Sequence, residues 1–202
     1  GCRGLGNRMA VVVHDGHAVA EPAAASARTA GGESLRPHAP PPRADAAVAF
    51  APDRVLAIMT ADCLPVVVAA RDGSRIGAAH AGWRGLAAGV IENTLAALGG
   101  EGRDYVAWLG PAIGAAAFEV GDEVRAAFVD ADAGAAAAFA ANARGRWQAD
   151  LCALARRRLG RLGVSDVAGG DACTYADAER WYSFRRDRDG GRMVTLAWLE
   201  SR

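Results

Sequence analysis

Lysine is absent from this chain of 202 residues, whose 23 basic side chains are all arginine. Without an amine side chain, Schiff-base catalysis, lysine-assisted phosphate loops and protein-kinase chemistry are excluded. The 23 acidic residues bring the formal net charge to zero. No uniform field therefore draws the protein onto nucleic acid or an anionic membrane, and we expect neither as a partner.

Long apolar runs are also missing, since none approaches the roughly 20 residues of a membrane span. The first residues lack the apolar core of a secretory signal. Four cysteines, Cys2, Cys63, Cys152 and Cys173, are too irregularly spaced for a disulfide framework or a paired zinc knuckle. We therefore expect a cytoplasmic protein with reduced thiols.

Residues 1–42 differ from the rest, because they are rich in Ala, Gly, Pro and Ser. This composition predicts an atypical N-terminal segment, truncated or poorly ordered. From residue 43 to 202 the pattern is regular and predicts one mixed α/β domain, with β-sheets covered by helices. The expected strands are 55–59, 64–70, 75–79, 105–109, 164–167 and 193–199, and the expected helices are 86–98, 121–129, 133–143 and 151–162.

An Asp-Gly pair at 72–73 separates two of these strands and is typical of a β-hairpin turn. With that pair in the turn, Cys63 lies opposite Gly82, and Pro65 lies opposite His80. Side chains alternate along a strand, so Cys63 and His80 share one face as diagonal neighbours, roughly 7–8 Å apart. A thiolate and an imidazole at that separation can meet, or can bind one metal ion.

Three interpretations of this pair remain open. Cys63, His80 and another histidine form a zinc or copper site with an open position for water or substrate. Alternatively, His80 deprotonates Cys63, which then attacks an electrophile. In the third, Cys63 is a small buried hydrophobe and His80 a satisfied core residue. Arg84, at an expected helix start, adds a planar donor for phosphate or carboxylate.

Four motifs occur in a fixed order along the chain. They are TADCLPV at 60–66, HAGWRG at 80–85, GPAIG at 110–114 with FEVG at 118–121, and CTY at 173–175 with SFRRD at 183–187. Aromatic residues interleaved with arginine in the last motif suit stacking on a flat ring beside a charged group. In this order the motifs resemble the laccase-domain family, multicopper polyphenol oxidases of the peptidoglycan-editing-factor type, over about residues 43–200.

The resemblance implies an α/β sandwich of mixed β-sheets flanked by helices, with a likeness to cysteine hydrolases, and makes 43–202 the laccase-domain catalytic domain. It also implies a metal ion, zinc or alternatively copper, on two histidines and one cysteine. Cys63 and His80 match two of these ligands by position. The third is expected upstream, where His14 follows a valine as in the family motif; His17 is the substitute if the register is shifted.

In function, the resemblance implies a metal-dependent purine nucleoside phosphorylase acting on adenosine, inosine, guanosine and methylthioadenosine, with adenosine deaminase activity. Cys63, His80 and Arg84 are the expected catalytic residues, with Arg84 holding phosphate. Ser183, Arg185 and Arg186 are expected to close over the nucleoside or phosphate.

Three rivals remain. The first is a laccase-like copper oxidase of phenols, although four histidines are too few for a multicopper cluster. The second is a cysteine hydrolase that edits peptidoglycan precursors through Cys63. The third is a binding module that has lost the third metal ligand.

Overall fold

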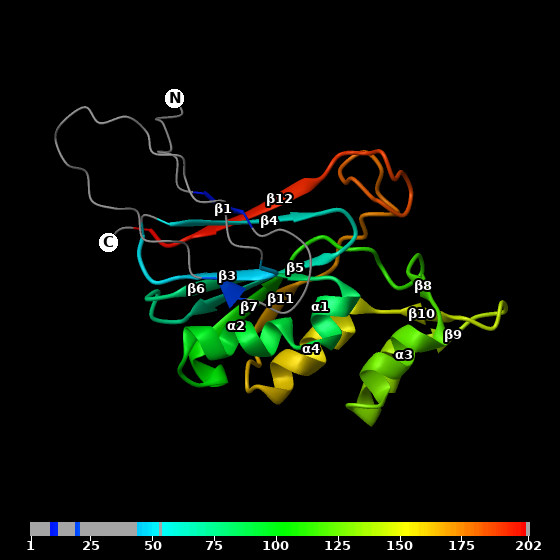
Figure 1. The fold of residues 1–202 in the computed structure, drawn as a ribbon, viewed down its shortest axis with the longest axis horizontal. Coiled ribbons are helices and arrows are strands. Elements are labelled where there is room, and N and C mark those ends of the chain that lie inside the picture. The colour runs from blue at the N-terminus through cyan, green and yellow to red at the C-terminus, as the bar shows by residue number, and fades with distance from the viewer. Residues whose placement is uncertain (1–8, 12–18, 21–43, 53, 201–202) are drawn as a thin grey trace.

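The computed structural model describes residues 9–11, 19–20, 44–52 and 54–200. Two β-sheets lie face to face and helices cover the outer face of the larger one (Figure 1). The smaller sheet has the order β1-β4-β12, and the larger has the order β11-β7-β5-β6-β3-β2. Their strands are β1 (Met9–Val11), β2 (Val19–Ala20), β3 (Ala46–Ala49), β4 (Val55–Thr60), β5 (Leu64–Ala70), β6 (Ile76–Ala81), β7 (Tyr105–Leu109), β11 (Val167–Gly169) and β12 (Met193–Trp198).

The strand β5 is buried on both faces, because each face meets a different layer. Leu64, Val66 and Val68 point toward the helices and belong to the main hydrophobic core. Val67 and Ala69 point the other way and pack against the core between the two sheets. This two-sided burial explains why the strand reads as a continuous apolar run.

Helices α1 (Trp83–Ala87), α2 (Val90–Leu98) and α4 (Leu151–Arg161) lie beneath the larger sheet (Figure 1). Beside these helices lies a small subdomain. It consists of α3 (Asp122–Val129) and an antiparallel sheet of β8 (Glu119–Val120), β10 (Trp147–Ala149) and β9 (Phe139–Ala141). Short 3₁₀ helices, η1 (Gly102–Asp104) and η2 (Ala133–Ala138), precede β7 and β9. The predicted mixed α/β fold with helix-covered sheets is confirmed.

Two predicted helices are wrong in detail. The helix expected over 86–98 is two helices, α1 and α2, separated at Gly89. Gly89 has a φ of 91°, a left-handed conformation that glycine adopts without strain and that ends a helix. The helix expected over 133–143 is the short 3₁₀ helix η2 followed by strand β9, so its alanine-rich composition misled the prediction.

Within the described part of the chain, no helix is both long enough and apolar enough to cross a lipid bilayer. Most of the segment 1–42 lies outside the described residues. The exceptions are β1, which pairs in parallel with β4, and β2, which pairs in parallel with β3. The prediction for that segment therefore stays a prediction.

Candidate functional site

The hairpin of β5 and β6 has the register that the Asp-Gly turn predicts, with Pro65 paired to His80. Gly82 lies where Cys63 and His80 meet. A Cβ atom added to Gly82 would lie 2.9 Å from Cys63 Sγ and 3.8 Å from His80 Nε2. The sulfur and the imidazole nitrogen therefore face the same small space, which exists because residue 82 has no side chain.

The environment of Cys63 disfavours the charged thiolate form. Burial raises the pKa of Cys63 to about 11, and the carboxylates of Asp62 and Asp45 add to the effect while Arg84 opposes it. The bare thiol is therefore protonated at neutral pH. Nucleophilic cysteines need a lowered pKa, whereas metal binding displaces the thiol proton directly.

Arg84 lies on the first turn of α1, directly after the Gly82 junction. Its guanidinium stacks on the Trp83 ring, 4.3 Å from the ring centroid, and the side chain is exposed. A stacked guanidinium keeps its in-plane N–H donors available for a planar or tetrahedral oxyanion. Its position beside Cys63 puts this donor set at the edge of the candidate site.

Asp62 joins two of the other motifs at the site through three separate segments, a role that the sequence analysis missed. Its carboxylate accepts hydrogen bonds from the Thr174 hydroxyl and from the Arg185 backbone N–H, each at 2.6 Å. Its carbonyl oxygen accepts a third, at 2.9 Å, from the Ile113 backbone N–H. The only available signal was its place beside Cys63, because the partners lie far away in the sequence.

Ser183 and Arg186, which are predicted to bind substrate, form hydrogen bonds to other residues of the protein. Ser183 is buried, and its hydroxyl accepts a hydrogen bond from the Arg186 backbone N–H. The Arg186 guanidinium donates to the carbonyls of Thr174, Tyr175 and Trp181 at 2.6–2.8 Å. These contacts fix the loop in place, and a direct role in substrate binding stays a prediction.

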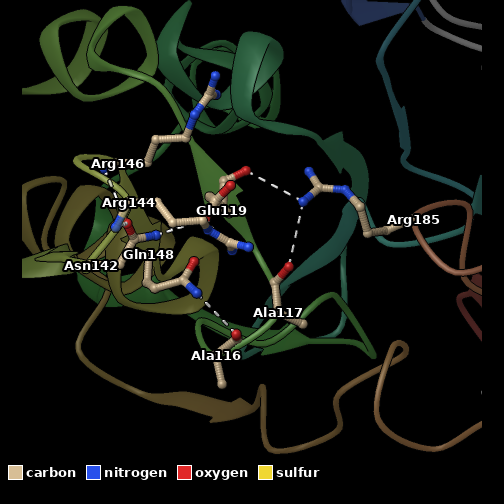
Figure 2. A network of polar contacts seen from close by, with 8 residues as sticks. All are labelled: Ala116, Ala117, Glu119, Asn142, Arg144, Arg146, Gln148 and Arg185. Atoms are coloured by element: carbon tan, nitrogen blue, oxygen red, sulfur yellow. Dashed lines mark hydrogen bonds and ion pairs between the residues drawn. The ribbon is translucent and has the colours of Figure 1, made fainter.

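Arg185 reaches from this loop to the small sheet. Figure 2 shows its guanidinium directed at the carbonyl oxygens of Ala117 and Glu119, at 3.5 and 3.3 Å. It also lies over the Phe118 ring, 5.5 Å from the centroid. The carboxylate of Glu119 in turn accepts hydrogen bonds from Asn142 and Arg144 (Figure 2). The motif at 118–121 is thereby tied to the loop at 183–187.

An apolar cavity of about 510 Å³ opens on the same face of the larger sheet as Cys63. It has two tryptophans, Trp108 on β7 and Trp181, in its walls. Trp108 pairs with Val67, which shares the face of β5 that carries Cys63. Its size and lining suit a small ligand with a flat ring. The further lining residues are Thr60, Val67, Pro111, Met193, Val194, Thr195, Leu196 and Ala197.

Two residues of the site carry donor atoms that suit a metal ion. Thiolate sulfur and imidazole nitrogen are the donors that zinc and copper prefer, so Cys63 and His80 fit as two ligands. In the described ranges, no group of three or more His, Cys, Asp or Glu residues is arranged to hold a metal ion. The predicted third ligand, His14, and its substitute His17 lie outside those ranges.

Comparisons with known proteins give close relatives. The chain is 57% identical over 160 residues to a protein of Xylella fastidiosa named purine nucleoside phosphorylase, covering 78% of this chain and 62% of the relative. It is 51% identical over 157 residues to purine nucleoside phosphorylase YfiH of Escherichia coli, covering 78% and 64%. The chain thus spans less than two thirds of the length of these curated relatives.

Solved structures agree with the fold. A crystal structure of a Neisseria meningitidis protein matches with a TM-score of 0.79 and 48% identity, over 80% of this chain and 67% of that one. The structure of YfiH from Bacillus licheniformis matches with a TM-score of 0.73 and 29% identity, over 78% and 62%. The sequence profile described as multi-copper polyphenol oxidoreductase laccase matches residues 5–200. The chain therefore belongs to the multicopper polyphenol oxidoreductase laccase family.

Proposed function

We propose that this chain carries the metal-dependent catalytic site of a purine nucleoside phosphorylase, acting on adenosine, inosine, guanosine and methylthioadenosine, with adenosine deaminase activity. One observation supports it above the rest. Cys63 Sγ and His80 Nε2 converge on Gly82 in a chain that is 57% identical to a relative named purine nucleoside phosphorylase.

In this proposal Cys63 and His80 hold zinc, or alternatively copper, with His14 as the third ligand. The bound ion would supply Lewis-acid activation of an oxygen atom in the site. Two histidines and one cysteine would hold the ion as three protein ligands and would leave it accessible to water or substrate, as in catalytic zinc sites.

Arg84 binds and orients phosphate through its in-plane N–H groups. A phosphate oxygen then attacks C1′ of the ribose, the C1′–N9 bond breaks, and the base leaves with the bonding electrons and takes up a proton. The product is ribose 1-phosphate. Orienting two reactants in this way removes much of the entropic barrier of a bimolecular step.

The purine lies in the cavity between Trp108 and Trp181. That cavity is on the same face of β5 as Cys63, four positions and about 13 Å further along the strand at the usual rise per residue. Gly110 lets the Trp108 ring approach Pro65, since a Cβ there would lie 2.9 Å from the ring and 2.5 Å from Pro65 Cγ. The cavity lining does not include Cys63, His80 or Arg84, so the ribose would have to extend from the cavity toward these residues.

Two rival functions are less well supported. A cysteine hydrolase needs a reactive thiolate, and burial with two nearby carboxylates raises the pKa of Cys63 instead. A multicopper oxidase needs many imidazole ligands, and the whole chain has four histidines. Oxidation of phenols through a single copper remains a testable side activity.

Phosphate-dependent release of free base from a panel of nucleosides, with metal analysis on the same sample, tests the proposal. We expect base release that needs phosphate and that falls after chelation and returns with added zinc. The Cys63→Ala variant should lose both metal and turnover, whereas Cys152→Ala should keep both. Full activity of Cys63→Ala, or base release without phosphate, would refute the assignment.

A further inference from the structure

Asp62, directly before Cys63, turns the chain from β4 into β5 in a conformation that few residues adopt. Its φ is 85°, and the residue is 9% exposed. It is the single non-glycine residue with a positive φ in the described ranges. A left-handed conformation strains most residues with a Cβ, aspartate and asparagine less than others, whereas glycine adopts it freely. A buried aspartate at this position therefore has to contribute through its side chain.

The side chain is held from two sides. Thr174 is fully buried, and its hydroxyl donates to one carboxylate oxygen, while the Arg185 backbone N–H donates to the other. Hydrogen bonds to an ionised acceptor are shorter and stronger than neutral ones. Because Ile113 binds the Asp62 carbonyl as well, three separate segments fix the residue that precedes Cys63.

We propose that Asp62 is the positioning residue of Cys63: the clamped carboxylate holds the left-handed turn that directs the sulfur toward His80 Nε2 above Gly82. The inference rests on the proposed function only in taking Cys63 as a functional group of the site. Both carboxylate oxygens of Asp62 accept hydrogen bonds from the protein. Asp62 acts through the backbone that it shares with Cys63.

The hydrogen bonds from Thr174 and Arg185 to the Asp62 carboxylate form what we call the clamp, and the clamp also links two parts of the site. The Arg185 N–H that binds Asp62 belongs to the loop whose neighbouring residues close the cavity at Trp181. A shift of that loop would pull on the same carboxylate that sets the direction of Cys63. Cys63 and the loop are therefore expected to move together.

The test compares the reactivity of two thiols in metal-free protein. Cys63 and Cys152 are both partly buried, and burial raises the pKa of each to about 11, so Cys152 is an internal reference. Iodoacetamide labelling at one fixed pH with chelator present, read by peptide mass spectrometry, gives the Cys63-to-Cys152 ratio. Thr174→Val removes one clamp contact and leaves the Asp62 charge in place. Asp62→Gly removes the carboxylate and relieves the backbone strain.

We expect Thr174→Val to raise the labelling ratio at least threefold, because it loosens the turn and exposes the sulfur while the Asp62 carboxylate stays in place. Asp62→Gly should raise the ratio further, because it also removes the carboxylate that raises the Cys63 pKa. Asp62→Asn, which keeps the shape and one acceptor oxygen, should fall between Asp62→Gly and the parent, and it keeps the comparison available if Asp62→Gly does not fold. Titration with Co²⁺ gives a second readout, since the thiolate–cobalt absorption band should need at least tenfold more metal in Asp62→Gly.

Asp132→Asn is the matched control, because Asp132 also binds two partners, Arg157 and Arg161, but lies away from Cys63. It should lower the Tm and leave the labelling ratio unchanged. If Thr174→Val lowers the Tm without moving the ratio, Asp62 is merely structural or acts on Cys63 through its charge alone, and the inference is overturned. If the ratio responds but the parent does not phosphorolyse nucleosides, the inference stands and the proposed function fails.

Discussion

Pro65 lies opposite His80 in the antiparallel ladder of β5 and β6, and this pairing brings Cys63 beside the imidazole. The ladder itself ends at Leu64 and Ala81. Cys63 and Gly82 therefore lie just beyond the last paired residues. There the two segments still face each other, but no ladder hydrogen bonds fix the backbone direction. A site at the end of a hairpin combines a fixed register with space for a ligand.

Replacing Gly82 with alanine should close that space. The new Cβ would lie 2.9 Å from Cys63 Sγ, closer than van der Waals contact allows, so the sulfur must move. The Gly82 backbone, with φ −62° and ψ 162°, accepts alanine without strain. We expect metal content and turnover to fall at least tenfold with little change in Tm, measured by metal analysis, phosphorolysis and thermal unfolding.

Gly160→Ala is the control for that substitution. Gly160 lies in α4, and nothing lies within 4 Å of a Cβ added there. Alanine in a helix interior stabilises by about 0.8–1 kcal/mol relative to glycine, so the Tm should rise slightly at unchanged activity. Equal loss of activity in both variants would contradict the close contact at Gly82.

Replacing Arg84 with glutamine should weaken phosphate binding. A hydrogen bond to a charged group contributes about 1.5–3 kcal/mol, which corresponds to a KM for phosphate raised roughly 10- to 100-fold. Initial rates at varied phosphate and saturating nucleoside measure it. Arg103→Gln, at an exposed residue paired with Glu101, should leave the KM for phosphate as it is. A change in the KM for nucleoside alone would assign Arg84 to the nucleoside.

Replacing Trp108 with alanine should weaken nucleoside binding. Stacking of a base on an aromatic side chain contributes about 1–3 kcal/mol, so we expect the KM for nucleoside to rise by about tenfold or more while that for phosphate stays constant. Trp198→Ala is the matched control, because Trp198 is 51% exposed and lies outside the cavity lining. Similar KM values in Trp108→Ala and the parent would exclude the cavity as the base subsite.

Asp132 should make stability depend on pH in the acid range. Hydrogen bonds from Arg157, with a further contribution from Arg161, hold the pKa of this carboxyl well below its usual range. Its stabilising effect is therefore complete above the unfolded pKa of about 3.9 and is lost as the pH falls below it toward the folded pKa. Asp132→Asn should be less stable than the parent at pH 7, and the difference should shrink below about pH 4.

Urea unfolding from pH 7 to pH 3 measures this difference. Asp130→Asn is the control, since Asp130 is exposed and makes no ion pair with the described residues. It should follow the parent across the range. A difference between Asp132→Asn and the parent that grows toward low pH would contradict the sign of the pKa shift.

Much of the fold follows from local pattern. The strands β5 and β7 have the bounds that their apolar runs predict, and the Asp-Gly pair fixes the hairpin register. The helix α4 follows a stripe of leucines, with Asp150 as its N-cap accepting from the Ala153 N–H. Short strands such as β3, four small apolar residues, carry no periodic signal and were missed.

The pairing of Pro65 with His80, which brings Cys63 beside the imidazole, was determined by the sequence itself, because strand alternation and a two-residue turn signal act over a few residues. The clamp on Asp62 was decided only by the tertiary structure. Asp62 and Thr174 are 112 positions apart, and no periodicity links residues whose contact depends on how sheets and loops pack. Local hydrogen-bonding geometry therefore determines the register of the β5–β6 hairpin, whereas long-range packing determines which residues hold Asp62 beside Cys63.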